Sequence, residues 1–144
     1  MDPIEFFTFA GTIAAQEHRG PAAYRSAASR AYYSAYHIAL RFLADLSFYC
    51  RGDGMSKHQW LQQCLINCGV SEATEAGKLL ENLQESRNDA DYRLDIAECE
   101  TRKNAQFCVE RADSIKSQID VCRQPAISQK INDGLIAYRK LTDR

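Results

Sequence analysis

The feature that most constrains the fold is the stretch PAAYRSAASRAYYSAYHIALRFLADLSFYC, residues 21–50. Its apolar residues recur at intervals of three and four, which places them on one face of an α-helix. Pro21 suits the first helical position, and RGDG at 51–54 suits a helix end. We therefore expect one helix of about 28 residues, roughly 42 Å long. Its apolar arc comprises Ala28, Ala31, Tyr32, Ala35, Ile38, Ala39, Phe42, Leu43 and Leu46.

The opposite side of this expected helix is polar. It carries Ser26, Arg30, Ser34, His37 and Arg41, with Tyr33 at the margin. A solvated face is the simpler interpretation. The alternative is a phosphate-binding face, because guanidinium, hydroxyl and imidazole groups can all donate hydrogen bonds to phosphate oxygens.

The remaining segments show the same periodicity, and no segment alternates apolar and polar residues as a strand would. Asp2 and Pro3 start a short helix with Phe6, Phe9, Ala10 and Ile13 on one face. Further helices are expected from Ser56 to Gly69, from Ser71 into the sequence RNDADY at 87–92, and from about Thr101 to Arg123. A weaker helix is expected in the tail, with Ile127, Ile131, Leu135 and Tyr138 inward, although Gly134 costs about 1 kcal/mol relative to alanine.

These patterns predict an all-α fold. We expect an antiparallel up-and-down bundle of four to five main helices, with short terminal helices. A chain of 144 residues fits a single domain over 1–144, with its core at about 20–125 and a C-terminal helical tail at 126–144.

The charge is small overall and uneven along the chain. The net charge of -1 gives no global basic field of the kind that indicates nucleic-acid binding. Residues 71–100 hold nine acids against three bases, and residues 101–144 hold nine bases against five acids. Two solvated faces that touch each other are the simpler interpretation, and an asymmetry that favours a nucleic-acid partner is the alternative.

The six cysteines fall mostly at apolar helical positions, which is typical of reduced core thiols. Cys64 and Cys68, with the distant His58, do not match the spacing of known zinc sites, so we expect no metal and no cofactor. The start of the sequence has no basic targeting region, and no apolar run is long enough to span a bilayer. We therefore expect a cytoplasmic protein without a membrane partner.

The sequence RNDADY, residues 87–92, places a charge on an apolar face. In helical projection Arg87 lies with Leu80, Leu83 and Ala90, whereas Tyr92 lies about 140° away. A buried charge needs a partner, and Asp91 is one turn further along. The pair is either a polar clasp that holds the helix end, or a cationic fork that binds phosphate together with Arg30, Ser34 and His37.

The sequence SRAYYSAYHIALRFL, followed further along the chain by RNDADY, resembles the HEPN domains of prokaryotes. The likeness is to the small stand-alone group with SRAYYAxxHAA and RxxADY motifs, and it covers roughly residues 20–125. It implies an up-and-down helical bundle that forms a homodimer. Many members of this family are metal-independent endoribonucleases of toxin–antitoxin or defence systems. In these members an R-x4-6-H motif from each protomer meets its counterpart at the dimer axis.

Carried onto this chain, the resemblance assigns the motif arginine to Arg87 and the polar residue after it to Asn88. The histidine position holds Tyr92, and a tyrosine hydroxyl is a poor proton shuttle at pH 7, which argues against ribonuclease turnover. His37 could bring an imidazole from the long helix, whereas His18 and His58 lie near helix ends and form no constellation. The candidate catalytic residues are therefore Arg87, Asn88 and Tyr92, and the candidate phosphate-binding or supporting residues are Arg30, Tyr33, Ser34, His37 and Asp91.

Three functions follow as hypotheses. The first is a toxin–antitoxin or defence protein that acts on or binds RNA or a nucleotide. The second is a non-catalytic module that binds a cognate antitoxin, a nucleotidyltransferase or another protein. The third is a purely structural dimer or adaptor.

Overall fold

The structure, a computed structural model, describes residues 1–52 and 54–143, and all regular elements of these residues are helical. The prediction of an all-α chain is confirmed. The elements are α1 (Ile4–Ala14), α2 (Pro21–Asp45), α3 (Lys57–Asn67), α4 (Ser71–Tyr92), the 3₁₀ helix η1 (Ala97–Glu100), α5 (Arg102–Cys122) and α6 (Pro125–Thr142). Within these described residues, no helix combines the length and the apolar character needed to cross a membrane.

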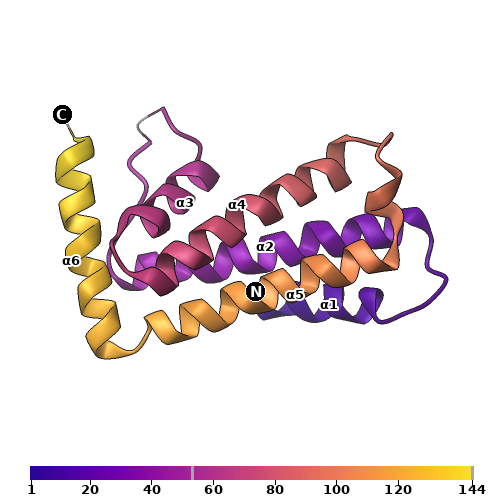
Figure 1. The fold of residues 1–144 in the computed structure, drawn as a ribbon, viewed down its shortest axis with the longest axis horizontal. Helices are drawn as coiled ribbons and strands as arrows, with labels where there is room; N and C mark the ends of the chain where they lie inside the picture. Colours follow the sequence, from indigo (N-terminus) through magenta and orange to yellow (C-terminus); the bar gives the residue numbers. More distant parts are fainter. Residues whose placement is uncertain (53, 144) are drawn as a thin grey trace.

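Helix α2 is the centre of a helical bundle and packs against α1, α4 and α5. These four helices lie along the long axis of the molecule (Figure 1). In the chain order α1, α2, α4 and α5, each runs antiparallel to the one before it. The short α3 packs on α4, and α6 stands across one end of the bundle beside α3 (Figure 1). The expected up-and-down bundle is therefore present, and α6 crosses its end.

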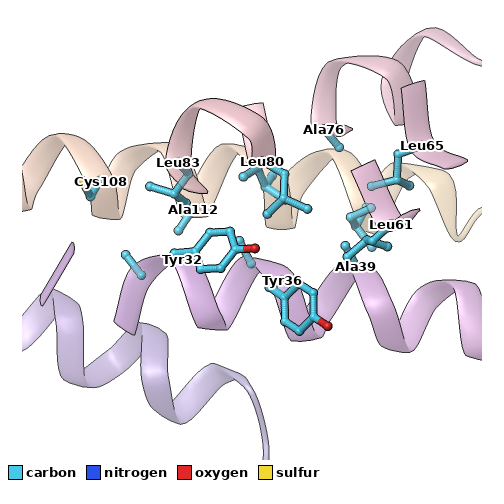
Figure 2. Close-up of a cluster of buried hydrophobic side chains, with 14 of the residues drawn as sticks. Tyr32, Tyr36, Ala39, Leu61, Leu65, Ala76, Leu80, Leu83, Cys108 and Ala112 are labelled. Atoms are coloured by element: carbon cyan, nitrogen blue, oxygen red, sulfur yellow. The ribbon is translucent and has the colours of Figure 1, made fainter. Parts of the chain in front are cut away.

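The apolar arc predicted for α2 forms much of the core. Ala28, Ala31, Ala35 and Ala39 are fully buried, and their small side chains let neighbouring helices approach closely. Tyr32 is also fully buried, and Figure 2 shows its ring beside the side chains of the facing helices. The outer members of the predicted arc, Ile38 and Leu46, are only partly buried.

Helix α2 ends at Asp45, earlier than predicted. Ser47 adopts a left-handed conformation with φ 59°, and its N–H donates to the carbonyl of Ala44 at 2.8 Å. The N–H of Phe48 donates to the carbonyl of Leu43 at 2.9 Å, which completes a Schellman cap. This turn brings Phe48 into the core, where it is 5% exposed. The sequence concealed this end because a serine occupies the position that glycine usually takes.

Gly134 has a packing role that the sequence did not predict. A Cβ atom at this position would lie 1.8 Å from the carbonyl oxygen of Cys68, at the end of α3. The glycine therefore allows α6 to cross α3 at close range, and its cost in helix propensity is secondary. The inward positions of α6 are as predicted, because Ile131 and Leu135 are fully buried and Ile127 and Tyr138 are partly buried.

The predicted helix signals are mostly confirmed. The Ser56 hydroxyl accepts from the N–H of Gln59 at the start of α3, and Gly69 follows α3 with φ 80°. Thr101 caps α5 in the same way as Ser56 caps α3. One predicted core residue is wrong: Phe9 is 51% exposed on α1.

The cysteines agree with the prediction of reduced core thiols. All six are free, and five are buried, while Cys50 is partly buried. Burial raises the pKa of Cys64 to about 12, and it raises the pKa of Cys108 and of Cys122 to about 11. These thiols therefore stay protonated at neutral pH and behave as apolar side chains.

Candidate functional site

Arg87 lies near the end of α4, and only 12% of its side chain is exposed. Its Nε atom is 2.9 Å from Oδ2 of Asp91, which confirms the predicted pair. The Nε–H nevertheless has no hydrogen-bond partner among the described residues, so the contact is an ion pair without a directed hydrogen bond. The same carboxylate oxygen accepts from the Ser29 hydroxyl at 3.1 Å, which ties α4 to α2.

The terminal nitrogens of Arg87 donate to side chains. Nη2 donates to the Tyr33 hydroxyl at 2.6 Å and makes a long contact of 3.4 Å with the Tyr92 hydroxyl. Nη1 donates to Oδ1 of Asn88 at 3.0 Å. We call these five residues, Arg87 with Tyr33, Asn88, Asp91 and Tyr92, the Arg87 cluster. Since each of its hydrogen-bond acceptors is a side chain, the cluster can rearrange without unfolding the backbone.

Aromatic rings surround the Arg87 guanidinium. Its Cζ atom is 5.0 Å from the ring centre of Tyr33, 5.3 Å from that of Tyr92 and 5.8 Å from that of Tyr32. A cation over a ring face is attracted by the electrons of the ring. Tyr92 is 71% exposed, so it lies between the guanidinium and solvent. Although Tyr92 projects about 140° from Arg87 on an ideal helix, its long side chain at the last helical residue reaches back to the arginine.

The predicted stripe on α2 divides into two parts. The Arg30 guanidinium lies 5.3 Å from the ring centre of Phe6 and 5.8 Å from that of Tyr33. The His37 ring stacks on the same two rings, at 6.3 Å and 6.2 Å. Arg30, Tyr33 and His37 therefore share one surface with Phe6.

Ser34 does not belong to this surface. It is 1% exposed, and its hydroxyl has no hydrogen-bond partner within residues 1–52 and 54–143. The prediction that Ser34 supports phosphate binding is therefore unsupported by its position, because a ligand at the surface cannot reach a hydroxyl sealed among helices. Helical projection placed Ser34 on a polar face, but α2 is covered by α1, α4 and α5, so this side of the helix is also buried.

His58 also lies beside these aromatic residues, which its sequence position did not predict. Its Nδ1 atom is 2.5 Å from the Tyr32 hydroxyl, and its ring lies 4.3 Å from that of Tyr36. The expectation that His58 forms no constellation was wrong. The Ser56 cap predicts the start of α3, but only the packing of α3 brings the ring to α2. His18, in contrast, lies outside the cluster with 95% of its side chain exposed.

The pKa of each of these two histidines is lowered. Burial lowers the pKa of His37, with further contributions from Arg41 and Lys57. Burial also lowers the pKa of His58, with contributions from Arg87 and His37. A histidine with a lowered pKa is neutral at pH 7, so positive charge at this surface comes from the arginines and Lys57.

Arg25 was also missed, and it has a different role. It is 7% exposed and donates to the main-chain carbonyls of residues 89, 90, 93, 94 and 96, at 2.9 to 3.3 Å. Its Nε and Nη2 atoms also donate to the carboxylate of Glu100. We call this arrangement the Arg25 clasp. It adds donors to carbonyls at the end of α4 and in the following turn, of which those of residues 89, 93 and 96 also accept a main-chain N–H, and so it fixes the segment around Asp91 and Tyr92.

Two further results bear on the site. Within the described parts of the chain, no group of three or more His, Cys, Asp or Glu side chains is placed to hold a metal ion. Comparison of the chain with protein-family models, with curated proteins and with solved structures gives no match in any of the three.

Proposed function

We propose that this protein is a HEPN-type domain that binds the phosphate of RNA or of a nucleotide through Arg87. The observation that carries the proposal is the state of the guanidinium. Asp91, Tyr33 and Asn88 hold it in place, and the exposed Tyr92 lies beside it with its hydroxyl 3.4 Å from Nη2. Because the partners of its terminal nitrogens are side chains that can rotate, the guanidinium can present these N–H groups to an anion with planar or forked oxygens.

The surroundings of Arg87 favour a nucleic-acid component as the ligand. Tyr92 exposes 71% of its surface directly beside the guanidinium, and a base can stack on such a ring. Arg30 and His37 lie on the adjoining surface of α2, stacked against Phe6 and Tyr33. Cationic groups interleaved with aromatic rings are typical of surfaces that bind single-stranded nucleic acid.

The proposal concerns binding, and cleavage is not part of it. In the HEPN ribonucleases that this sequence resembles, the histidine of the R-x4-6-H motif transfers the proton. In RNDADY, Tyr92 stands at the position of that histidine. A tyrosine hydroxyl is poorly suited to proton transfer near neutrality. Its contact with Arg87 is that of a cover and a weak acceptor.

The resemblance to HEPN domains also leads us to propose an oligomeric state and a cellular role. The protein forms a homodimer and serves a toxin–antitoxin or defence system in the cytoplasm. The second candidate function is a non-catalytic module that binds a cognate antitoxin or a nucleotidyltransferase. The exposed Tyr92 favours this candidate too, because a tyrosine at the surface is a common anchor for a partner protein.

Binding can be tested with a fluorescein-labelled oligoribonucleotide of mixed sequence and, separately, with ATP. We expect one of the two to bind the wild-type protein, and Arg87→Met to weaken that binding by about tenfold or more. The matched control is Arg111→Met, which removes an arginine stacked on Phe107 at 4.0 Å, outside the cluster. The proposal fails if neither probe binds, or if Arg87→Met binds as tightly as the control. Shortened RNA on a gel would contradict the restriction to binding.

A further inference from the structure

His58 and Arg87 flank the same pair of tyrosine rings, although they come from different helices. The His58 ring is 5.7 Å from the ring centre of Tyr32 and 6.4 Å from that of Tyr33. The Cζ atom of Arg87 is 5.8 Å and 5.0 Å from the same two rings. The N-terminal turn of α3 therefore brings an imidazole to the end of α4 that carries the guanidinium.

The Tyr32 hydroxyl determines which nitrogen of His58 carries a proton. Tyr32 is fully buried, and among the described residues its hydroxyl has one hydrogen-bond partner, Nδ1 of His58 at 2.5 Å. If the hydroxyl only accepted, its own hydrogen would be buried without a partner, which is unfavourable. Burial also raises the pKa of Tyr32, so the oxygen keeps its proton. The hydroxyl therefore donates to Nδ1, and the hydrogen of the neutral ring is on Nε2.

The groups around His58 keep the ring neutral. From α2 these are Tyr32, Tyr33, Tyr36 and His37, and from α4 the group is Arg87. None of them is an acid that would stabilise an imidazolium. A neutral imidazole with hydrogen on Nε2 cannot accept a proton on that nitrogen, but it donates a hydrogen bond from it.

We propose that His58 is a second ligand-binding residue of the Arg87 site, and that it donates its Nε2–H to a phosphate oxygen of the RNA or nucleotide. Tyr32 is the positioning residue that holds the ring through Nδ1. Arg87 supplies the charge of the site, and His58 supplies a neutral donor. This inference rests on the proposed function, since it deepens the description of the same site.

The variant that tests this role is His58→Phe, because phenylalanine keeps a ring between the tyrosines while removing both nitrogens. We expect it to weaken binding of the oligoribonucleotide, made without a terminal phosphate, or of ATP, by roughly tenfold. The control is His18→Asn at an exposed histidine with φ 59°, a conformation that asparagine tolerates, and it should bind like wild type. Equal affinity of His58→Phe and the control would overturn the inference.

The charge state gives a second readout. With the oligoribonucleotide, wild-type affinity should change less than about threefold between about pH 7 and about pH 8, because a histidine whose pKa is lowered from its usual value stays neutral in that range. The neutral-donor role would be overturned by two results together: the affinity of the wild-type protein falls about tenfold as the pH rises, and the affinity of His58→Phe does not depend on pH.

The free protein provides a test that is independent of ligand. Long-range ¹H–¹⁵N spectra of the histidine rings should show His58 at pH 7 as the neutral tautomer with hydrogen on Nε2, and Tyr32→Phe should remove this preference. An imidazolium, or hydrogen on Nδ1, would contradict the inference even if RNA binds. Loss of binding in Arg87→Met with no loss in His58→Phe would refute the inference and leave the proposed function standing. Absence of any binding in the wild type would refute the proposed function.

Discussion

Arg25 and Arg87 are both largely buried arginines at the same end of α4, yet their hydrogen-bond partners are of different kinds. Arg25 donates to five main-chain carbonyls and to Glu100. Arg87 donates to a hydroxyl and to an amide, and pairs with a carboxylate that is 26% exposed. The Arg25 clasp joins segments of backbone, whereas the Arg87 cluster joins side chains at the surface.

This difference separates a structural cation from a candidate binding cation. Replacing the partners of Arg25 would require the end of α4 and the following turn to unfold, because those partners are backbone atoms. The partners of Arg87 need only rotate, and Tyr92 is 71% exposed and free to move. A polar clasp, which was considered for Arg87, is thus made by Arg25, and the phosphate fork is what we propose for Arg87.

The largest effect is expected at the Arg25 clasp. Arg25→Met should lower the free energy of unfolding by about 3–5 kcal/mol, because it removes a buried cation that pairs with Glu100 and donates to five main-chain carbonyls. The melting temperature should fall by roughly 10–15 °C. Calorimetry or urea denaturation measures both quantities.

The control for this experiment is Arg93→Met. The Arg93 side chain is 65% exposed and pairs with Asp89 four residues earlier, so its loss should change stability by less than about 0.5 kcal/mol. If Arg25→Met melts like this control, Arg25 is not a clasp and the comparison fails.

A smaller effect on stability is expected at Arg87. Arg87→Met should lower the free energy of unfolding by about 1 kcal/mol, since Asp91 keeps its hydrogen bond from Ser29 and is partly exposed to water. Arg87→Met should also bind the ligand more weakly. Variants of Arg25 that still fold should keep the affinity of the wild-type protein. A loss of stability as large as that of Arg25→Met would show that Arg87 too is a clasp.

Much of the fold could be predicted because its helices carry local signals. The three-and-four spacing on α2 and α5, the Ser56 cap and Gly69 each act within one or two turns, and the structure contains all of them. The end of α2 was missed because burial of Phe48 outweighs the preference for glycine at Ser47. Gly134 was misjudged for a similar reason, since its close neighbour Cys68 is distant in sequence.

The candidate site was predicted only where its contacts are local. The Arg87–Asp91 pair follows from a separation of four residues on one helix. Arg25 and His58 could not be found in this way, because their partners are on other elements: Arg25 contacts residues 89–100, and His58 contacts α2. Helical periodicity places residues on faces, but it does not say which distant face will lie opposite.

The central claim is that Arg87 binds ligand while Arg25 holds the fold, and the ¹H–¹⁵N resonances of the arginine Nε groups test it most directly. The two signals can be assigned from the Arg87→Met and Arg25→Met spectra together with backbone assignments. Titration with the oligoribonucleotide or ATP should shift the Arg87 Nε–H signal, because a phosphate bound at the guanidinium changes the electrostatic environment of this group, and should leave the Arg25 signal in place. A stationary Arg87 signal in a protein that binds either ligand would contradict the claim.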